Sequence, residues 1–379
     1  MKKKIFFLTT GRSDYHRQLP IINFLKLSSE IQLKILITGS HSTQLFGKTA
    51  DEIKKNKVSW SNCCPKKYST KAEDISSNIS SCQDLIDKSF KKDCPDILIL
   101  FGDRYEVLAG ALAAFGKKIL IVHIHGGSVT LGSFDDQTRH SLTKLSHIHL
   151  TSIEEYGKRL RQLGEEKWRI KIVGAPGIDY IKKNCESIKI EAIKNFLLKK
   201  KKFILVCLHS ETTNLKDLPK QLKEVEKVLK KIKYKIIITF PNADPGSDKI
   251  INFFKKLAFK NKDKMIFVKN LGTDYYYLLK RCEFILGNSS SGIVEAASFL
   301  RPAINLGIRQ KGKLMPKNVI NCKFKSKLIL NAISKIKKMK LSKNYKNPYG
   351  DGKSGIRIAN ILEKIKIKNY HFQKKFINK

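Results

Sequence analysis

Short apolar runs alternate with longer amphipathic stretches along this chain, and the alternation occurs in two series. The first series lies at residues 4–9, 32–38, 96–101, 119–123, 148–151 and 170–173, and the second at residues 203–208, 235–239, 265–268, 284–287 and 303–306. Strands that alternate with helices form parallel sheets covered by helices on both faces. Each series therefore predicts a Rossmann-like half, and the predicted fold class is α/β.

The two series are separated by Gly174-Ala175-Pro176-Gly177 and a lysine-rich, helix-like segment that reaches Lys202. With 379 residues the chain is long enough for two domains of ordinary size. We predict an N-terminal domain at residues 1–175 and a C-terminal domain at residues 176–353. Residues 354–379 are expected to begin with a helix that packs back on the N-terminal domain. Ligands of such folds bind at the carboxyl ends of the strands, so we expect the ligand in a cleft between the two halves.

Composition excludes several classes of protein. The formal net charge of +42 would attract polyanions, but the lysines are spread over the whole chain, and aromatic residues do not alternate with them. We therefore expect no nucleic-acid partner. No run approaches the roughly 18 apolar residues of a membrane span, and no secretory signal is recognisable, so we expect a cytoplasmic protein without a membrane partner. Eight cysteines without a CxxC pair do not indicate a structural zinc site.

The densest group of reactive side chains follows two neighbouring strands of the first series. GDRYE at residues 102–106 follows one strand and HIHGGS at residues 123–128 follows the next, leading to Asp135 and Arg139. Proton-transfer chemistry needs an acid and a base on either side of a small substrate. Asp103, His125 and Asp135, with nearby arginines to tune them, are the candidates for these roles.

The same residues permit two other interpretations. Asp103 could cap a helix, His125 could be an ordinary turn histidine, and the carboxylates could pair with Arg104 and Arg139. A metal site is the third possibility, but His123 and His125 alternate along a strand and would point to opposite faces.

The loops of the second series indicate an anion site. GNSSSG at residues 287–292 follows a strand, and a helix is expected to begin at Ile293, so that free backbone N–H groups would face a diphosphate. Glu295 could accept both hydroxyls of a ribose, unless Ser289 is merely a helix cap. His209 and Asn242 also follow strands. In the first half, Arg12 could reach a phosphate, whereas the single glycine at position 11 does not satisfy the G-x-G-x-x-G of a dinucleotide site.

Taken together, these segments resemble the hydrolysing UDP-N-acetylglucosamine 2-epimerases, which share a GT-B-like fold of two Rossmann-like domains. The resemblance covers nearly the whole chain. It rests on TGRSDY at 10–15, GDRYE at 102–106, HIHGG at 123–127, Asp135-Asp136 with RHSLTKLSH at 139–147, PNAD at 241–244, GNSSSG at 287–292 with Glu295, RQKG at 309–312 and NPYGDG at 347–352.

The resemblance implies a reaction in two steps without a cofactor or metal. Loss of the C2 proton and departure of the nucleoside diphosphate give a 2-acetamidoglucal, and water then adds with inverted stereochemistry at C2. The products would be N-acetylmannosamine and UDP, for the synthesis of sialic-acid-type sugars. A diacetamido-trideoxyhexose carried by UDP or GDP, on the way to legionaminic acid, is the alternative substrate. Glycosyl transfer on the same fold, or binding of nucleotide sugars or polyanions without turnover, is the alternative of another class.

The resemblance also implies roles for individual residues. Asp103 and Asp135 would be acid/base groups, His125 stands where relatives carry Glu or His, and Arg139 would orient Asp135 or the sugar. The nucleotide would be held by Arg12, His209, Ser289, Ser290, Glu295 and Arg309, with Asn242 as a further candidate. Ser128 and His16 depart from the pattern of many relatives, which leaves the exact sugar open. Relatives commonly form homodimers or homotetramers, and we expect the same here.

Overall fold

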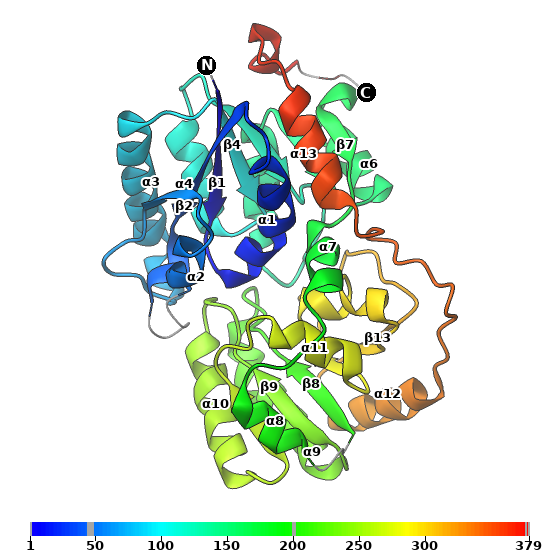
Figure 1. The fold of residues 1–379 in the computed structure, drawn as a ribbon. Helices are drawn as coiled ribbons and strands as arrows, with labels where there is room; N and C mark the ends of the chain where they lie inside the picture. The colour runs from blue at the N-terminus through cyan, green and yellow to red at the C-terminus, as the bar shows by residue number, and fades with distance from the viewer. Residues whose placement is uncertain (1, 44–48, 199–201, 376, 378–379) are drawn as a thin grey trace. The chain divides into compact units, whose positions relative to one another are not determined.

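A computed structural model describes residues 2–43, 49–198, 202–375 and 377, which form two compact α/β units (Figure 1). Unit 1 comprises Met1–Ser128, Asp135–Tyr180 and Tyr349–Lys379, and unit 2 comprises Val129–Phe134 and Ile181–Pro348. The chain leaves unit 1 at Tyr180 and returns at Tyr349. Its short passage into unit 2 at Val129–Phe134 was not expected.

Unit 1 is built on a parallel sheet of seven strands in the order β3-β2-β1-β4-β5-β6-β7. The strands in this order are β3 (Ser59–Asn62), β2 (Ile31–Ile37), β1 (Lys3–Thr9), β4 (Ile97–Phe101), β5 (Leu120–Ile124), β6 (Ile148–Thr151) and β7 (Ile170–Ile172). The strand order reverses where β1 lies between β2 and β4. Loops diverge at such a reversal, and open α/β sheets bind ligands there.

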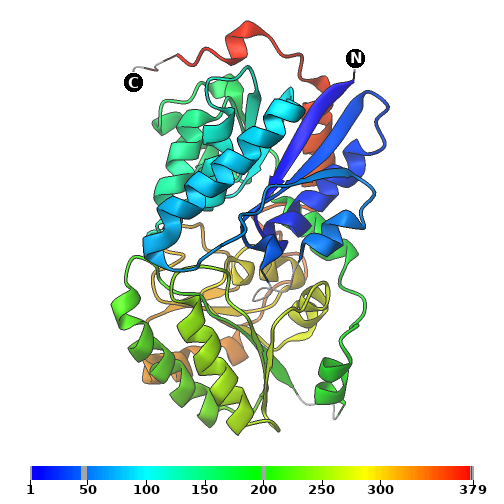
Figure 2. The ribbon, with the colours of Figure 1, turned by 90° about the vertical axis from the view of Figure 1, so that its left-hand side faces the viewer.

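Helices cover both faces of this sheet because alternate residues of its strands point to opposite sides. Ile5 and Phe7 of β1 pack toward α1 (Arg12–Leu25) and α13 (Ser354–Lys364). Phe6 and Leu8 pack on the other face toward α3 (Ile75–Lys92) and α4 (Tyr105–Ala114). Figure 2 shows α3 in front of this sheet. The remaining helices are α2 (Ala50–Lys54), α5 (Asp135–Leu145), α6 (Glu154–Gln162) and α7 (Pro176–Lys183), and α7 spans the boundary between the units.

Unit 2 repeats the design with six parallel strands in the order β10-β9-β8-β11-β12-β13. They are β10 (Met265–Val268), β9 (Lys235–Thr239), β8 (Phe203–Cys207), β11 (Ile285–Gly287), β12 (Ala303–Leu306) and β13 (Val319–Cys322). One face packs on α9 (Leu218–Lys231), α10 (Ser247–Lys260) and α12 (Ser326–Lys338), and the other on α8 (Glu191–Leu197) and α11 (Asp274–Arg281).

The end of the chain packs on unit 1. Gly355 at the start of α13 lies so close to Pro20 of α1 that an added Cβ would come within 2.8 Å of it. The segment beyond α13 is held by the fully buried Arg169. This arginine donates to the main-chain oxygens of His371 (2.8 Å) and Gln373 (2.7 Å). Lys374 pairs with Glu165 at 2.7 Å. The helix that the sequence predicts after residue 353 therefore lies on unit 1, and these contacts fix the segment that follows it.

Two strands were missing from the sequence prediction. β3 reads SWSN and is largely exposed, and β13 is only partly buried. Both are edge strands, so they have one strand neighbour and need less apolar surface than the central strands. An apolar run is therefore not required, and the pattern of hydrophobicity does not reveal them.

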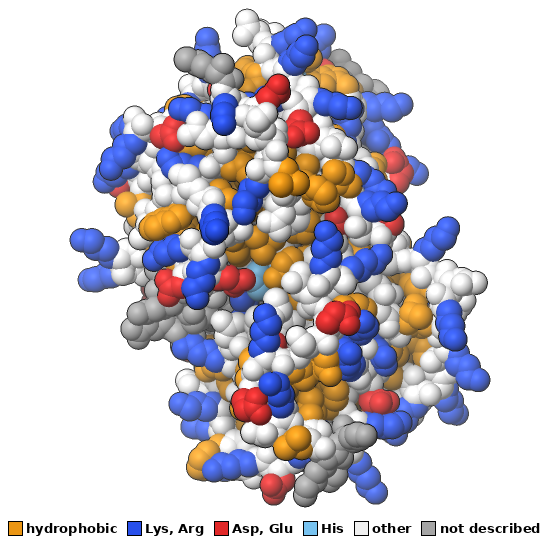
Figure 3. Space-filling view, in the orientation of Figure 1, with side chains coloured by type: hydrophobic (Ala, Val, Ile, Leu, Met, Phe, Trp, Pro, Cys, Tyr) orange, Lys and Arg blue, Asp and Glu red, His pale blue; other side chains and the backbone are white. Residues whose placement is uncertain are grey.

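The surface carries no single basic patch on the face that Figure 3 shows, where lysine and arginine side chains are scattered. None of the helices in the described ranges has the length and apolar character of a membrane-spanning helix.

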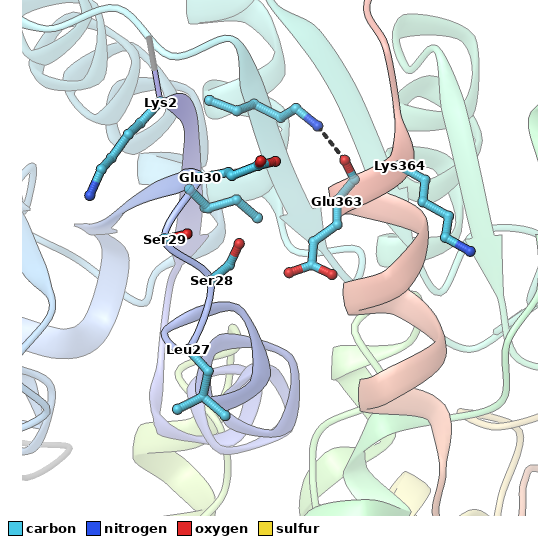
Figure 4. A pocket seen from close by; sticks show the side chains of 9 residues that line it. Lys2, Leu27, Ser28, Ser29, Glu30, Glu363 and Lys364 are labelled. Carbon is cyan, nitrogen blue, oxygen red and sulfur yellow. Dashed lines mark hydrogen bonds between the residues drawn. The ribbon is translucent and has the colours of Figure 1, made fainter.

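A polar pocket lies where β1 begins and α1 and α13 end, with Ser28, Glu30 and Lys364 among its lining residues (Figure 4). Lys3 donates there to the carbonyl of Glu363 at 2.7 Å. This pocket is at the edge of the sheet opposite the strand carboxyl ends.

Candidate functional site

In unit 1 an enclosed arginine joins the loops that follow β4 and β5. Arg139, one turn into α5, has only 1% of its side chain exposed. Its guanidinium pairs with the carboxylate of Asp103, and its Nη1 donates to Asp136 (2.7 Å) and to the carbonyl of Ser128 (3.0 Å). Residues from three separate segments are thereby held in one cluster, which we call the Arg139 cluster.

The electrostatics of this cluster keep the arginine charged. Burial alone would lower the pKa of Arg139, but the carboxylates of Asp103, Asp136 and Asp135 outweigh burial and raise it. Asp103 is 32% exposed, so its carboxylate is both tied to a fixed cation and accessible. The structure therefore shows the Asp103–Arg139 pair that the second interpretation anticipated. Asp103 is not the cap of α4, because Arg104 occupies that position.

The two histidines of HIHGG have different surroundings. His123 is fully buried, and burial lowers its pKa to about 4. The neutral ring lies with its Nε2 2.7 Å from the carbonyl oxygen of Gly102, just before Asp103. His125 has a φ of 75°, in the left-handed region, and packs edge-on against Phe101 at 4.9 Å. Backbone strain of this kind concentrates at functional sites.

No group of three or more His, Cys, Asp or Glu in the described ranges is placed to hold a metal ion. The two histidines do not converge: His123 bonds to the β4 loop, whereas His125 contacts Phe101.

Beside Asp103, a second network fixes the next residue of the GDRYE segment. Arg104 donates to the fully buried Glu106 from Nε (3.1 Å) and from Nη2 (3.1 Å). The hydroxyl of Tyr68 donates to the same carboxylate and lies 2.9 Å from the hydroxyl of Tyr105. Sequence reasoning missed Tyr68, because it lies in a polar stretch without a motif and meets Glu106 only in the folded chain.

Arg12 is the first residue of α1, at the carboxyl end of β1. The loop before it is fixed by Asp14, whose carboxylate accepts from the backbone N–H of Thr10 (2.8 Å) and Gly11 (3.0 Å). Burial raises the pKa of Asp14 in spite of these hydrogen bonds. His16 follows in the same helix, stacks on Tyr180 at 4.9 Å and pairs with Glu52 at 2.7 Å.

Unit 2 brings together a second cluster at the carboxyl ends of β8, β9, β11 and β12. His209 follows β8, and its Nδ1 accepts from the backbone N–H of Asn242 at 3.1 Å, which places the proton of the neutral ring on Nε2. Arg309 follows β12 and is 8% exposed. Its hydrogen bonds are long: Nη1 donates to the main-chain oxygen of Asn288 at 3.4 Å, and Nη2 donates to the carboxylate of Asp244 at 3.5 Å. Its buried Nε has no hydrogen-bond partner among the described residues.

The serine segment corrects one expectation. No α-helix begins at Ile293; the chain instead forms two short 3₁₀ turns, η6 (Ser290–Gly292) and η7 (Ala296–Phe299). Leu300, in the left-handed region, and Pro302 end the segment before β12, so a regular helix cannot continue past Phe299. Ser289 does act as a cap, because its Oγ accepts from the backbone N–H of Ser291. Glu295 lies between the two turns and is 3% exposed.

The segment Val129–Phe134 belongs to unit 2, although it lies between two parts of unit 1 in the chain. Its Leu131 N–H donates to the carbonyl of Lys311 at 3.1 Å, and its Phe134 N–H donates to the hydroxyl of Thr212 at 3.1 Å. A Cβ on Gly132 would come within 2.5 Å of the Cα of Arg309. The chain between HIHGGS and Asp135 therefore packs directly on the backbone of Arg309.

With this geometry established, comparison with known proteins identifies the family. Residues 24–363 match the family model described as UDP-N-acetylglucosamine 2-epimerase. The chain belongs to this family. The predicted fold class is confirmed: it is α/β and GT-B-like, with two Rossmann-like halves.

Individual epimerases are similar along most of the chain. A Campylobacter jejuni protein named GDP/UDP-N,N'-diacetylbacillosamine 2-epimerase (hydrolyzing) is 34% identical over 84% of each chain. A Legionella pneumophila protein named UDP-N,N'-diacetylbacillosamine 2-epimerase (hydrolyzing) is 32% identical over 96% of this chain and 97% of its own. The crystal structure of Methanocaldococcus jannaschii UDP-GlcNAc 2-epimerase in complex with UDP-GlcNAc and UDP matches with a TM-score of 0.78 at 24% identity. The match covers 96% of this chain and 99% of that one. This chain is a UDP-sugar 2-epimerase of the hydrolysing type.

Proposed function

We propose that the protein converts a UDP-linked 2-acetamido sugar and water into UDP and the free sugar inverted at C2. The Arg139 cluster of unit 1 carries out the proton transfers, and the cluster around Arg309 in unit 2 binds the nucleotide. In the first step the C2–H bond breaks, a basic group takes the proton, and the C1–O bond breaks as UDP leaves. In the second step a proton returns to the opposite face of C2, and the hydroxyl of water adds to C1.

The observation that carries this proposal is the pairing of an accessible Asp103 with an enclosed Arg139. A carboxylate held in place by a fixed cation loses little freedom when it meets a substrate, and general acid/base catalysis depends on such positioning. Asp135 at the start of α5 adds to the field at Arg139 and is the second acid/base candidate. His125, held in a strained conformation at the end of β5, is the third.

Arg309 supports the nucleotide role of unit 2. Its guanidinium is nearly buried, yet its contacts are long, and its Nε has no partner among the described residues. A buried cation with unused donors is stabilised by a doubly hydrogen-bonding anion such as a diphosphate. Ser289 and Ser290 supply hydroxyls in the same cluster, and Glu295 is the candidate for the ribose. Arg12, His209 and Asn242 are the other proposed nucleotide contacts.

Two sugars are the candidates for the substrate. The family description and the sequence resemblance indicate UDP-N-acetylglucosamine, which would yield N-acetylmannosamine. The names of the Campylobacter and Legionella relatives favour UDP-N,N'-diacetylbacillosamine. His16 and Ser128, which depart from many relatives, are the residues that we expect to separate the two. A cytoplasmic location and a homodimeric or homotetrameric state stay predictions from the sequence.

A substrate panel tests the proposal. The purified protein is incubated in D₂O with UDP-N-acetylglucosamine and with UDP- and GDP-linked N,N'-diacetylbacillosamine, and the products are identified by NMR. We expect release of the nucleoside diphosphate and a free sugar that is inverted and deuterated at C2, because the returning proton comes from solvent. A product that keeps its C2 configuration and proton would indicate glycosyl transfer or simple hydrolysis. Nucleotide binding without any product would contradict the enzymatic assignment.

A further inference from the structure

In unit 2 the backbones of β8 and β11 approach unusually closely at their last residue pair. Gly287, the last residue of β11, has a φ of 145° and lies opposite Cys207, the last residue of β8. A Cβ at this glycine would lie only 2.0 Å from the carbonyl oxygen of Cys207. Glycine is therefore required here, and its absence of a side chain lets the two backbones approach closely.

The side chain of the next residue, Asn288, continues the hydrogen bonding where the strands stop. Its backbone N–H still donates to the carbonyl of Cys207 at 3.1 Å. Its side-chain Oδ1 then accepts from the N–H of His209 at 2.7 Å, and its Nδ2 donates to the carbonyl of His209 at 2.9 Å. The amide thus bonds to His209 as a neighbouring strand would, and it is completely buried.

The main-chain oxygen of Asn288 holds the other side of the cluster. It accepts from Nη1 of Arg309 at 3.4 Å and from Nε2 of Gln310 at 3.0 Å. Gln310 is 1% exposed, so this bond is also inside the protein. One residue is therefore bonded to both His209 and Arg309, which come from loops after different strands, and it directly precedes Ser289.

We propose that Asn288 is the positioning residue of the UDP site: its side chain fixes the backbone of His209 in the geometry that the nucleotide requires, and its main-chain oxygen faces the guanidinium of Arg309. The inference rests on the proposed role of unit 2 in nucleotide binding. Asn288 itself acts through its neighbours: both of its side-chain hydrogen-bonding atoms are engaged by His209. Removing the amide takes away its two hydrogen bonds to the backbone of His209 and weakens the hold on that residue.

The test measures UDP binding rather than turnover, so it does not depend on which sugar is the substrate. Isothermal titration with UDP is carried out on the native protein, Asn288→Ala and Asn288→Asp, together with thermal unfolding without nucleotide. We expect Asn288→Ala to weaken UDP binding about tenfold to a hundredfold, by analogy with the loss found when residues that hold the ligands of a metal ion are removed. Asn288→Asp should weaken it further, because it removes the donor to His209 and adds a negative charge beside the diphosphate site.

Asn305→Ala is the matched control. Asn305 is a buried asparagine of β12 in the same unit, and its amide donates to Asn321 at 2.8 Å instead of to the UDP site. This variant should lose a comparable amount of thermal stability and bind UDP within twofold of the native protein.

If Asn288→Ala loses stability but binds UDP within twofold of the native protein, Asn288 is only a structural residue and the inference is wrong. Should that variant fail to fold, Asn288→Ser keeps an acceptor for the His209 N–H and must show an intermediate loss of UDP affinity; unchanged affinity overturns the inference equally. Failure of the native protein to bind UDP would instead overturn the proposed function of unit 2. In any variant that turns over, KM for the nucleotide sugar should rise with the UDP dissociation constant.

Discussion

The two clusters lie at the carboxyl ends of parallel strands in sheets of the same kind, yet they are built from different chemistry. In unit 1 the Arg139 cluster consists of opposite charges, with an enclosed guanidinium between Asp103 and Asp136. In unit 2 the guanidinium of Arg309 reaches the main-chain oxygen of Asn288 only at 3.4 Å, and its ion pair with Asp244 is long at 3.5 Å.

This difference fits the two tasks that we propose for the two units. A carboxylate that exchanges protons with a substrate must be held at a fixed position, and hydrogen bonds from an enclosed guanidinium hold it there. A site that receives a doubly negative group needs a cation whose hydrogen bonds are not already used, surrounded by neutral donors. The first requirement fits Arg139 of unit 1, which has short hydrogen bonds to carboxylates. The second fits Arg309 of unit 2, whose hydrogen bonds are long.

The largest effect should come from Asp103→Asn in unit 1. The amide keeps the shape of the side chain but cannot accept the C2 proton, so kcat should fall by about 10²–10⁴-fold, the usual contribution of a general acid or base. Because the substitution leaves every proposed UDP contact in place, the UDP dissociation constant should change little, as measured by titration. An enzyme that still epimerises at the native rate would show that another residue is the base and would remove the contrast between the units.

Arg309→Ala should act mainly on the UDP dissociation constant, which Asp103→Asn leaves nearly unchanged. Losing a hydrogen-bonding cation from a diphosphate site costs about 1.5–3 kcal/mol, so UDP binding should weaken roughly tenfold to a hundredfold. Arg301→Ala is the control, because Arg301 lies in unit 2 but donates to the carbonyl of Lys280 at 2.8 Å. Equal losses of UDP affinity in both variants would mean that Arg309 supports the fold of unit 2 and not the ligand.

A smaller loss, about tenfold in UDP affinity, is expected for Glu295→Ala, since a carboxylate that accepts from ribose hydroxyls contributes charge-assisted hydrogen bonds. Glu295→Gln should retain part of the affinity because it keeps one acceptor. Competition by UDP against the nucleotide-sugar substrate gives the inhibition constant directly. An unchanged constant in Glu295→Ala would contradict the ribose role and leave the serines and Arg309 as the nucleotide contacts.

The smallest effect is a local loosening of unit 1 in acid. Burial by itself would raise the pKa of Glu165, but contacts from His149, Lys374 and Lys144 lower it to about 2. The stabilisation from this ionised carboxylate is complete above its ordinary pKa of 4.5 and is lost as the pH falls from there toward 2. Burial also lowers the pKa of His149 from 6.5, so charging this histidine below that pH opposes folding in the same direction.

Hydrogen exchange between pH 7 and pH 3 measures this loosening. Backbone amides around η8 (Asn369–His371) should lose protection in acid before those of β8 in unit 2. Glu165→Gln should show the fast exchange already at pH 7. Simultaneous loss of protection in both units would mean that the anchor of the chain end does not act locally.

Much of the architecture follows from the sequence because apolar runs in parallel strands are continuous and easily recognised. Each central strand of both sheets coincides with an apolar run; GDRYE stands directly after β4, and HIHGG and GNSSSG begin with the last residues of β5 and β11. The edge strands β3 and β13 escaped because an edge strand needs less apolar surface. The helix expected at Ile293 was wrong: the segment forms two 3₁₀ turns, and Leu300, in the left-handed region, ends it.

The sequence by itself determined the two α/β halves, the family and the positions after strands where reactive residues stand, since these depend on local patterns of hydrophobicity and short motifs. Only the tertiary structure decided the partners: that Asp103 pairs with Arg139, that Tyr68 meets Glu106, that Gly132 lies on the backbone of Arg309, and that Asn288 links His209 to Arg309. These contacts join residues that are distant in the chain. No local pattern encodes them, because their energies arise only when packing has excluded water and brought the groups together.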